Sequence, residues 1–329
     1  MSFMNLTAFF AMQRVACHIR RTNHTSVSTW KHKYTLKLPH LTTPFHDRAR
    51  LISTEVSRTV PHLEAPSLNS ANQPDHARDV SEQLEKSGIL KVSLGFSDNN
   101  SQYLEQLLLS LHQHHGHQLP ITHSSTRGWF WDIRPSNKNF QTANCQARSE
   151  TMEKFPWHTD CSYEDPPPRY FALQVLRPDR FGGGILSVMN VECLTEKLSP
   201  ATRASLMHPE YRITTPPEFV KNSAPGHIIG SLLVADKKGR FSMIRYRDDI
   251  LTPLSERASL ALDELKAVLN TSGQPNLTVN LTSDDLPERT IILVDNRRWL
   301  HARTDVKDPK RHLRRVRWDV IPFQTDFLR

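Results

Sequence analysis

The chain has 329 residues, a formal net charge of +8 at pH 7 and a pI of about 9.4, and only 37% of its residues are hydrophobic. No run approaches the ~18 to 20 apolar residues of a membrane span, so a soluble protein is expected, with part of the chain as tail or linker. The basic excess is concentrated in the first 46 residues and between Lys307 and Arg317, which argues against a nucleic-acid-binding protein.

The N-terminal segment, residues 1–46, is basic, rich in Ser and Thr and free of acidic residues. This composition is typical of a mitochondrial transit peptide, and the alternative is a tail without a targeting role in a cytoplasmic protein. Residues 47–79 are rich in Pro, Ser and Asn and are interpreted as a linker. The folded domain is therefore expected to span residues 80–329.

The first predicted elements are a helix at 80–86, a strand at 88–94 and a helix at 101–112, whose leucines recur at helical spacing. The second helix ends in a group of histidines, which is interpreted as a solvated helix end: His112, His114, His115 and His117. None of these elements is predicted to contain a catalytic or metal-binding residue.

The rest of the chain is predicted to be mainly strands. Alternating or apolar runs predict strands at 128–134, 169–177, 184–191, 227–235, 240–247, 277–281, 290–294 and 313–321. One helix, at 253–269, interrupts them, with Thr252 as its expected N-cap. This pattern favours a β-sandwich or jelly roll over a doubly wound sheet, and no GxGxxG or P-loop motif is present.

A search for metal ligands singles out His158 and Asp160. His158 is the only histidine with an aspartate two positions later, although His62 and His208 have a glutamate there. In a strand, residues i and i+2 point to the same side, so both could reach one ion. Non-haem iron oxygenases use two histidines and one carboxylate in this way. On spacing alone, an ion pair in a loop is the better interpretation.

The context of these residues resembles the TauD/TfdA family of 2-oxoglutarate dioxygenases, which includes taurine and γ-butyrobetaine dioxygenases. The resemblance covers about 128–319 and rests on motifs in one order: WHTDCSYEDPPP (157–168), a strand with a GGG turn (169–186), DNRRWLHAR (295–303) and RHLRRVRW (311–318). It implies a mainly β fold, with a double-stranded β-helix (jelly-roll) core and flanking and inserted α-helices.

The resemblance also implies the site. Fe(II) would be held by His158, Asp160 and His301, and Arg311 would bind the distal carboxylate of 2-oxoglutarate. Arg315 matches a second arginine that lies over an anionic substrate group in taurine dioxygenase. Arginine suits these roles because its charged fork matches a carboxylate. For the other cations, Arg303 is expected to brace the loop of His301, with Asp295 as a partner, and Arg314 to be solvated. Arg317 shares the face of Arg311 and Arg315, and a solvated position is its alternative.

The implied activity uses O2 and couples the oxidative decarboxylation of 2-oxoglutarate to oxidation, in most cases hydroxylation, of a small organic substrate. Arg315 favours an anionic group on that substrate. A homo-oligomer is compatible with the family. The aromatic residues Trp129, Phe130, Trp131 and Trp157 are interpreted as core, with a cage for a quaternary ammonium as the alternative.

One departure concerns the co-substrate site. Family members often have a threonine after the glycine turn, and Ile185 stands there in this chain. Either 2-oxoglutarate binds more weakly, or another donor such as Ser187 or Tyr170 compensates. The departure also leaves open a non-catalytic jelly-roll binding protein with a degenerate co-substrate site.

Overall fold

The computed structural model describes residues 60–122, 128–135, 146–220, 226–236, 239–271 and 277–320. The predicted N-terminal tail, and the linker up to residue 59, lie outside these residues, so the transit peptide and its cytoplasmic alternative stay predictions. Within the described part, no helix combines the length and the apolar character needed to cross a membrane.

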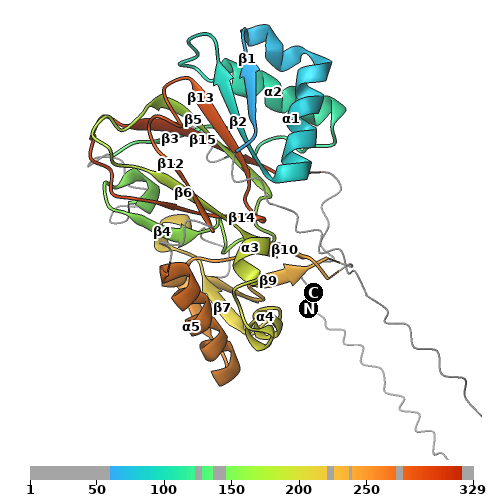
Figure 1. Ribbon diagram of the computed structural model, residues 1–329, viewed down its shortest axis with the longest axis vertical. Coiled ribbons are helices and arrows are strands. Elements are labelled where there is room, and N and C mark those ends of the chain that lie inside the picture. The colour runs from blue at the N-terminus through green and yellow to red at the C-terminus, as the bar shows by residue number, and fades with distance from the viewer. Residues whose placement is uncertain are drawn as a thin grey trace, which may run out of the picture. The chain divides into compact units, whose positions relative to one another are not determined.

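The larger sheet has six strands in the order β1-β2-β13-β5-β15-β3 (Figure 1). Their bounds are β1 His62–Ala65, β2 Ile89–Leu94, β13 Thr290–Asp295, β5 Tyr170–Arg177, β15 His312–Trp318 and β3 Trp131–Ile133. Only β1 pairs in parallel with its neighbour. Strands far apart in the sequence are thus neighbours, as in a jelly roll.

The smaller sheet has four antiparallel strands in the order β12-β6-β14-β4. Its strands are β12 Thr278–Leu281, β6 Leu186–Asn190, β14 Trp299–Arg303 and β4 Phe155–His158. One hydrophobic cluster joins the two sheets, with Phe171 and Ile292 from the larger and Val188 and Trp299 from the smaller. Two sheets packed on a shared core confirm the expected mainly β, jelly-roll architecture.

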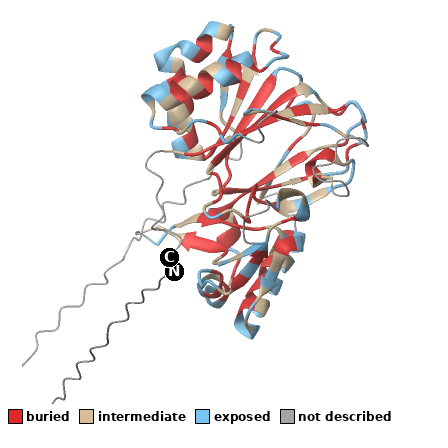
Figure 2. Ribbon diagram, turned by 180° about the vertical axis from the view of Figure 1, so that it is seen from behind, coloured by how far each residue is buried: buried red, intermediate tan, exposed pale blue. Residues whose placement is uncertain are grey.

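Helices α1 (Pro74–Ser87) and α2 (Gln102–His114) cover the other face of the larger sheet. Their buried leucines contact Leu90, Val92 and Leu293 of that sheet. Because both faces of the central strands are covered, every residue of β13 is buried (Figure 2).

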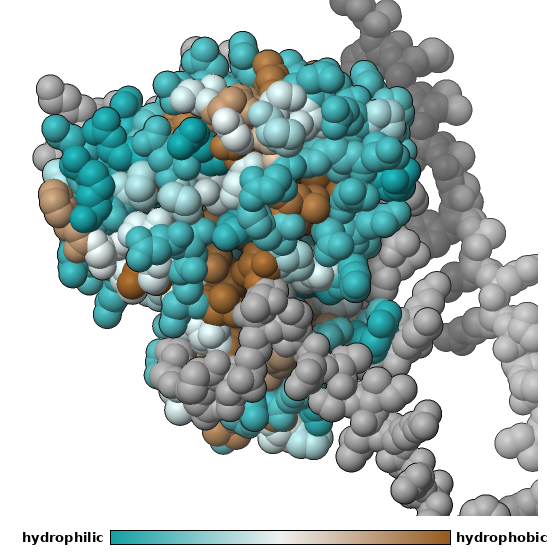
Figure 3. Space-filling model, turned by 45° about the horizontal axis from the view of Figure 1, so that its top comes forward, coloured by the Kyte–Doolittle hydropathy of each residue, from teal (hydrophilic) through white to brown (hydrophobic). Residues whose placement is uncertain are grey.

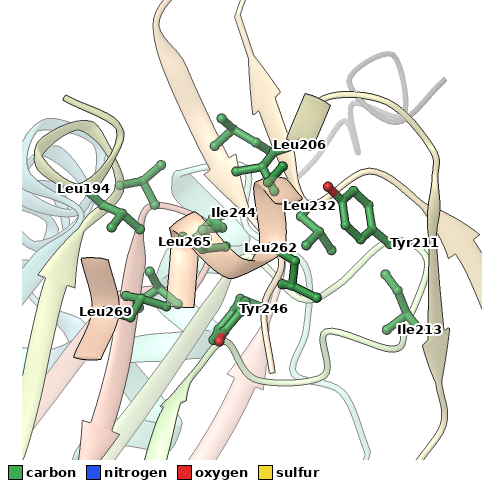
Figure 4. Close-up of a cluster of buried hydrophobic side chains, with 14 of the residues drawn as sticks. Leu194, Leu206, Tyr211, Ile213, Leu232, Ile244, Tyr246, Leu262, Leu265 and Leu269 are labelled. Atoms are coloured by element: carbon green, nitrogen blue, oxygen red, sulfur yellow. The ribbon is translucent and has the colours of Figure 1, made fainter. Parts of the chain in front are cut away.

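A third group of elements packs on the smaller sheet. It comprises α3 Val191–Thr195, α4 Pro200–Leu206, β7 Tyr211–Thr214, β8 His227–Gly230, β9 Leu233–Ala235, β10 Phe241–Ile244, β11 Leu251–Pro253 and α5 Glu256–Asn270. Their side chains form a cluster that includes Leu206, Ile244 and Leu265 (Figure 4). The cluster reaches Met189 and Leu300 of the smaller sheet, so this group supports β6 and β14 from outside.

The folded elements begin earlier than residue 80, where the domain was predicted to start. β1 and the first turns of α1 lie within the segment interpreted as linker. Proline was taken there as a sign of irregular chain, but Pro74 occupies the first turn of α1, where its missing N–H is not needed.

Two further predictions about helix ends were wrong. The N-cap of α5 is Ser255, whose hydroxyl accepts a hydrogen bond from the backbone of Ala258 at 3.1 Å, and not Thr252, which lies in β11. His117 is not solvated: it is buried, stacks on Tyr170 and accepts a hydrogen bond from the Trp318 indole at 2.9 Å. On the face of the molecule that Figure 3 shows, most of the surface is hydrophilic.

Candidate metal centre

The smaller sheet brings His158 and His301 together. In the antiparallel pair β4–β14, these two histidines are direct cross-strand partners, and their ring centroids lie 4.1 Å apart. Asp160 follows two residues after His158, and its Oδ1 lies 3.9 Å from Nε2 of His158 and 3.6 Å from Nε2 of His301. All three are buried, and their ligand atoms lie within 4.8 Å of one another.

The protonation of these groups suits a metal. Nδ1–H of His158 donates to the carbonyl of Pro156 at 2.8 Å, which leaves the lone pair of Nε2 free. Burial, and then the neighbouring His301, lower the pKa of His158, so the ring is neutral at pH 7. Burial alone would raise the pKa of Asp160, but Arg315 and His301 outweigh it and hold that pKa well below its usual range.

Asn296 fixes the backbone of Asp160. Its Oδ1 accepts a hydrogen bond from the N–H of Asp160 at 2.6 Å, and its Nδ2 donates to the carbonyls of Asp160 and Pro168, both at 2.9 Å. Asn296 belongs to the DNRRWLHAR motif, but no role of its own was predicted for it from the sequence. The structure gives it a positioning role that no spacing rule reveals.

An Asn296→Ala variant is expected to bind iron about 10- to 100-fold more weakly, because groups that orient metal ligands typically have effects of this size. Asn280→Ala is the matched control, since Asn280 contacts Ser187 on the outside of the smaller sheet. Metal titration of both purified variants checks this. Equal affinities in the two variants would contradict the role of Asn296.

A cavity next to these ligands contains Arg311. The cavity is lined by glycines, by polar residues and by apolar residues in similar number. The polar set includes His158, Asp160, Asp179, His301, Arg303, Arg311 and Arg315, the glycines are Gly183 and Gly184, and the apolar set includes Phe171, Leu173, Val175, Leu186, Ile292 and Leu313. Arg311 is 6% exposed and has no carboxylate partner among the described residues. Burial and the nearby Arg303 lower its pKa to about 10, so it is still charged at pH 7.

Gly184 allows Arg311 to lie flat against the turn. It has a φ of +63°, and a Cβ built on it would lie 2.8 Å from Nε of Arg311. Ile185 does not line the cavity, and its backbone N–H donates to Oγ1 of Thr304 at 3.0 Å, so a weaker binding of 2-oxoglutarate caused by Ile185 stays a prediction. Neither expected replacement lines the cavity: Ser187 donates to Asn280, and the hydroxyl of Tyr170 donates to Glu85.

A Gly184→Ala variant is expected to weaken 2-oxoglutarate binding by about 5- to 150-fold, the range that corresponds to the ~1–3 kcal/mol of an overpacked site. Gly182→Ala is the control: Gly182 also has a positive φ, +73°, but a Cβ there would meet nothing within 4 Å. Both variants carry the same backbone strain, so their ratio of dissociation constants isolates the contact with Arg311. A ratio of one would contradict that contact.

Three other arginines near the site have different partners. Arg315 contacts Asp160, with Nη1 at 3.2 and 3.0 Å from the two carboxylate oxygens, and lies over the Trp131 ring. Arg314 points away and pairs with Asp132. Arg303 was expected to brace the loop of His301 with Asp295 as a partner, and this was wrong. It donates instead to carbonyl groups of the segment before β4, and Asp295 pairs with Arg169.

The sequence left open whether Arg317 is solvated or shares the face of Arg311 and Arg315, and the structure supports the second position. Arg317 lines a second cavity that shares His158, Asp160 and Arg315 with the first, and Nη1 of Arg317 contacts Sγ of Cys161. Other residues of this cavity include Arg148, Tyr163, Glu218, Phe219 and Arg247. The tryptophans proposed as a cation cage belong to the cores and do not line it.

These residues fit iron and 2-oxoglutarate. Two imidazoles and one ionised carboxylate, all buried, form the donor set that leaves coordination positions free for other ligands. The adjoining cavity holds the metal ligands together with Arg311, a buried cation without a carboxylate partner in the described chain. A dicarboxylate that chelates a metal supplies what such a cavity lacks. The fold and these residues define a non-haem iron oxygenase.

Comparison with known proteins agrees. The family model described as "Taurine catabolism dioxygenase TauD, TfdA family" matches residues 55–317. The chain therefore belongs to the TauD/TfdA family, as the motifs suggested, and it is an enzyme, an oxidoreductase of the iron- and 2-oxoglutarate-dependent class. No curated protein matches the chain.

Solved structures share the fold. Asparagine oxygenase in complex with Fe(II), 2S,3S-3-hydroxyasparagine and succinate is 18% identical, with a TM-score of 0.58, and the match covers 79% of this chain and 93% of that one. Non-heme iron oxygenase OrfP in complex with Fe and alpha-ketoglutaric acid is 16% identical, with a TM-score of 0.54, covering 78% and 93%. At these identities the likeness establishes the fold alone.

Proposed function

We propose that this enzyme hydroxylates a small organic molecule that carries an acidic group, with iron held by His158, Asp160 and His301 and with 2-oxoglutarate anchored by Arg311. Bound iron and 2-oxoglutarate would allow O2 to act as the oxidant: one oxygen atom would enter succinate as 2-oxoglutarate loses carbon dioxide, and the other would enter a C–H bond of the substrate. The protein has to position the two small molecules and keep bulk water away.

The residues divide this work. Asn296 and the pairing of β4 with β14 hold the three metal ligands in place. The fork of Arg311 is suited to the distal carboxylate of 2-oxoglutarate, against the turn at Gly184. Apolar side chains such as Phe171, Leu173 and Leu313 line the same cavity and exclude water from it.

The proposal of an acidic group on the substrate rests on the arginines of the second cavity and on which of them already have a carboxylate partner. Arg148 and Arg247 both reach Asp249, at 3.7 and 2.7 Å, and Arg315 is paired with Asp160. Arg317 has no carboxylate bonded to it among the described residues, although burial lowers its pKa and disfavours its charge. A substrate carboxylate or sulfonate would neutralise it.

Glu218 lines the same cavity and has no hydrogen bond or ion pair within the described chain. It offers a place for a cationic group of the substrate. A small amino acid satisfies both residues, and asparagine oxygenase and OrfP, which share the fold, were crystallised with hydroxylated amino acids.

The test is succinate formation by the iron-loaded enzyme, measured with a panel of small amino acids, carboxylates and sulfonates and with uncharged isosteres. An acidic substrate is expected to stimulate succinate formation and to gain one oxygen atom by mass spectrometry. Arg317→Leu is expected to raise its KM by about 30-fold or more, since truncating one partner of a buried charge pair costs at least ~2 kcal/mol. Stimulation by uncharged compounds alone would contradict the proposal.

A further inference from the structure

Beyond the assignments above, we infer that Arg303 is a second arginine of the 2-oxoglutarate site and that it makes the enzyme selective for 2-oxo acids with a distal carboxylate. The inference rests on the proposed co-substrate cavity. It concerns a residue that the sequence assigned to bracing a loop.

The side chain of Arg303 points into the cavity that contains Arg311. Arg303 lies two residues after His301 on β14, so the two side chains share one face of the strand. Arg303 is 9% exposed and lines the same cavity as Arg311. The two guanidinium groups are near enough for Arg303 to lower the pKa of Arg311, second only to the effect of burial.

Bracing accounts for only part of this side chain. Nη1 donates to the carbonyl of Ser149 at 3.0 Å, and Nη2 donates to the carbonyls of Thr151 and Glu153. Nε of Arg303 is buried and has no hydrogen-bond partner among the described residues. The carbonyls hold the guanidinium in one orientation, and one of its donors is left for another acceptor.

Arg303 also has no carboxylate at ion-pair distance within the described chain, although Asp305 acts on it, and Asp179 on Arg311, from further away. No carboxylate of the described chain forms an ion pair with Arg303 or with Arg311, so one cavity contains two cations without bonded anions. Burying an unpaired charge is unfavourable, and a bound anion relieves the cost. 2-Oxoglutarate carries two negative charges, one for the metal and one for the arginines.

This role of Arg303 also indicates which residue replaces the family threonine, after the glycine turn, as a donor to 2-oxoglutarate. Ile185, Ser187 and Tyr170 all lie outside the cavity lining, so none of them supplies the second donor for the distal carboxylate. Nε–H of Arg303 is a charged donor already located there, and charged donors form the stronger hydrogen bonds.

The test compares 2-oxoglutarate with 2-oxovalerate, which has the same carbon chain but lacks the distal carboxylate. Dissociation constants are measured anaerobically by calorimetry on iron-loaded protein, for the wild type, Arg303→Gln, Arg303→Lys and the control Arg314→Gln. In Arg303→Gln, 2-oxoglutarate is expected to bind roughly 10- to 100-fold more weakly, while 2-oxovalerate is unaffected. Arg303→Lys is expected to fall between these values, and Arg314→Gln to match the wild type.

A purely bracing role would weaken both acids equally and leave their ratio unchanged, which would overturn the inference. If Arg303→Gln fails to fold, the test uses the wild-type protein. The NMR signal of the Arg303 Nε–H is assigned by comparison with the Arg303→Lys variant. This signal is expected to shift with 2-oxoglutarate and not with 2-oxovalerate. An equal response to both acids overturns the inference alone. Binding of neither acid to the wild type overturns the proposed function as well.

Discussion

A His301→Ala variant is expected to lose turnover of 2-oxoglutarate below detection and to bind iron at least ~100-fold more weakly. The reason is geometric: His301 is the cross-strand partner of His158, and without it only two protein ligands remain. His301 is a cleaner choice than Asp160, because removing Asp160 would leave Arg315 buried without its partner and destabilise the fold by ~3–5 kcal/mol.

The matched control is His62→Ala. His62 also has an acidic residue two positions later, and its Nε2 lies 3.1 Å from Glu64, but this pair is on the surface. This variant is expected to keep wild-type iron affinity and turnover. Iron titration and succinate formation check both proteins, with circular dichroism to show that both are folded. Retained turnover in His301→Ala would contradict the assignment of the metal ligands.

Arg311→Met is the second variant with a large expected effect. The dissociation constant for 2-oxoglutarate is expected to rise by roughly 30-fold to several thousandfold, since truncating one partner of a buried charge pair costs ~2–5 kcal/mol. Arg311 is buried and, within the described chain, has no carboxylate partner, so methionine also removes an unfavourable buried charge. The variant without co-substrate is therefore expected to melt no lower than the wild type.

This combination separates a binding role from a structural one. A residue that mainly supports the fold would lower the melting temperature when replaced, whereas Arg311→Met should lose only the stabilisation that 2-oxoglutarate gives. Arg314→Met is the control, because Arg314 lies three residues further along the chain, on β15, but pairs with Asp132 and does not line the cavity. Thermal melting with and without 2-oxoglutarate measures both effects. Unchanged stabilisation by 2-oxoglutarate in Arg311→Met would rule out the proposed anchor.

Much of the fold follows from local pattern. Alternating residues predicted β5, β6, β12, β13 and β15 close to their observed bounds, and helical leucine spacing predicted α2. The short strands β1, β4 and β7 were missed, because four residues carry too little periodicity to be recognised. The start of the domain was placed too late for a related reason, since composition does not distinguish a linker from a proline-capped helix.

The site was predictable only in part. The His-x-Asp spacing suggested His158 and Asp160, but spacing cannot show that β14 would pair with β4 and bring His301 to the same point. That information came from the order of motifs along the chain. The environment of Arg317, the carbonyls around Arg303 and the amide of Asn296 depend on contacts between distant segments, so no local pattern contained them. The homo-oligomer stays a prediction, because only one chain is described.

The most direct test of the metal and co-substrate centre is an anaerobic titration. Fe(II) and then 2-oxoglutarate are added to the purified protein, and the weak visible charge-transfer band of the chelate is followed in the wild type, His158→Ala and Arg311→Ala. The band is expected in the wild type, absent from His158→Ala and reached only at higher 2-oxoglutarate concentration in Arg311→Ala. Folded wild-type protein that binds iron but shows no band at saturating 2-oxoglutarate would contradict the account and favour a non-catalytic jelly-roll protein.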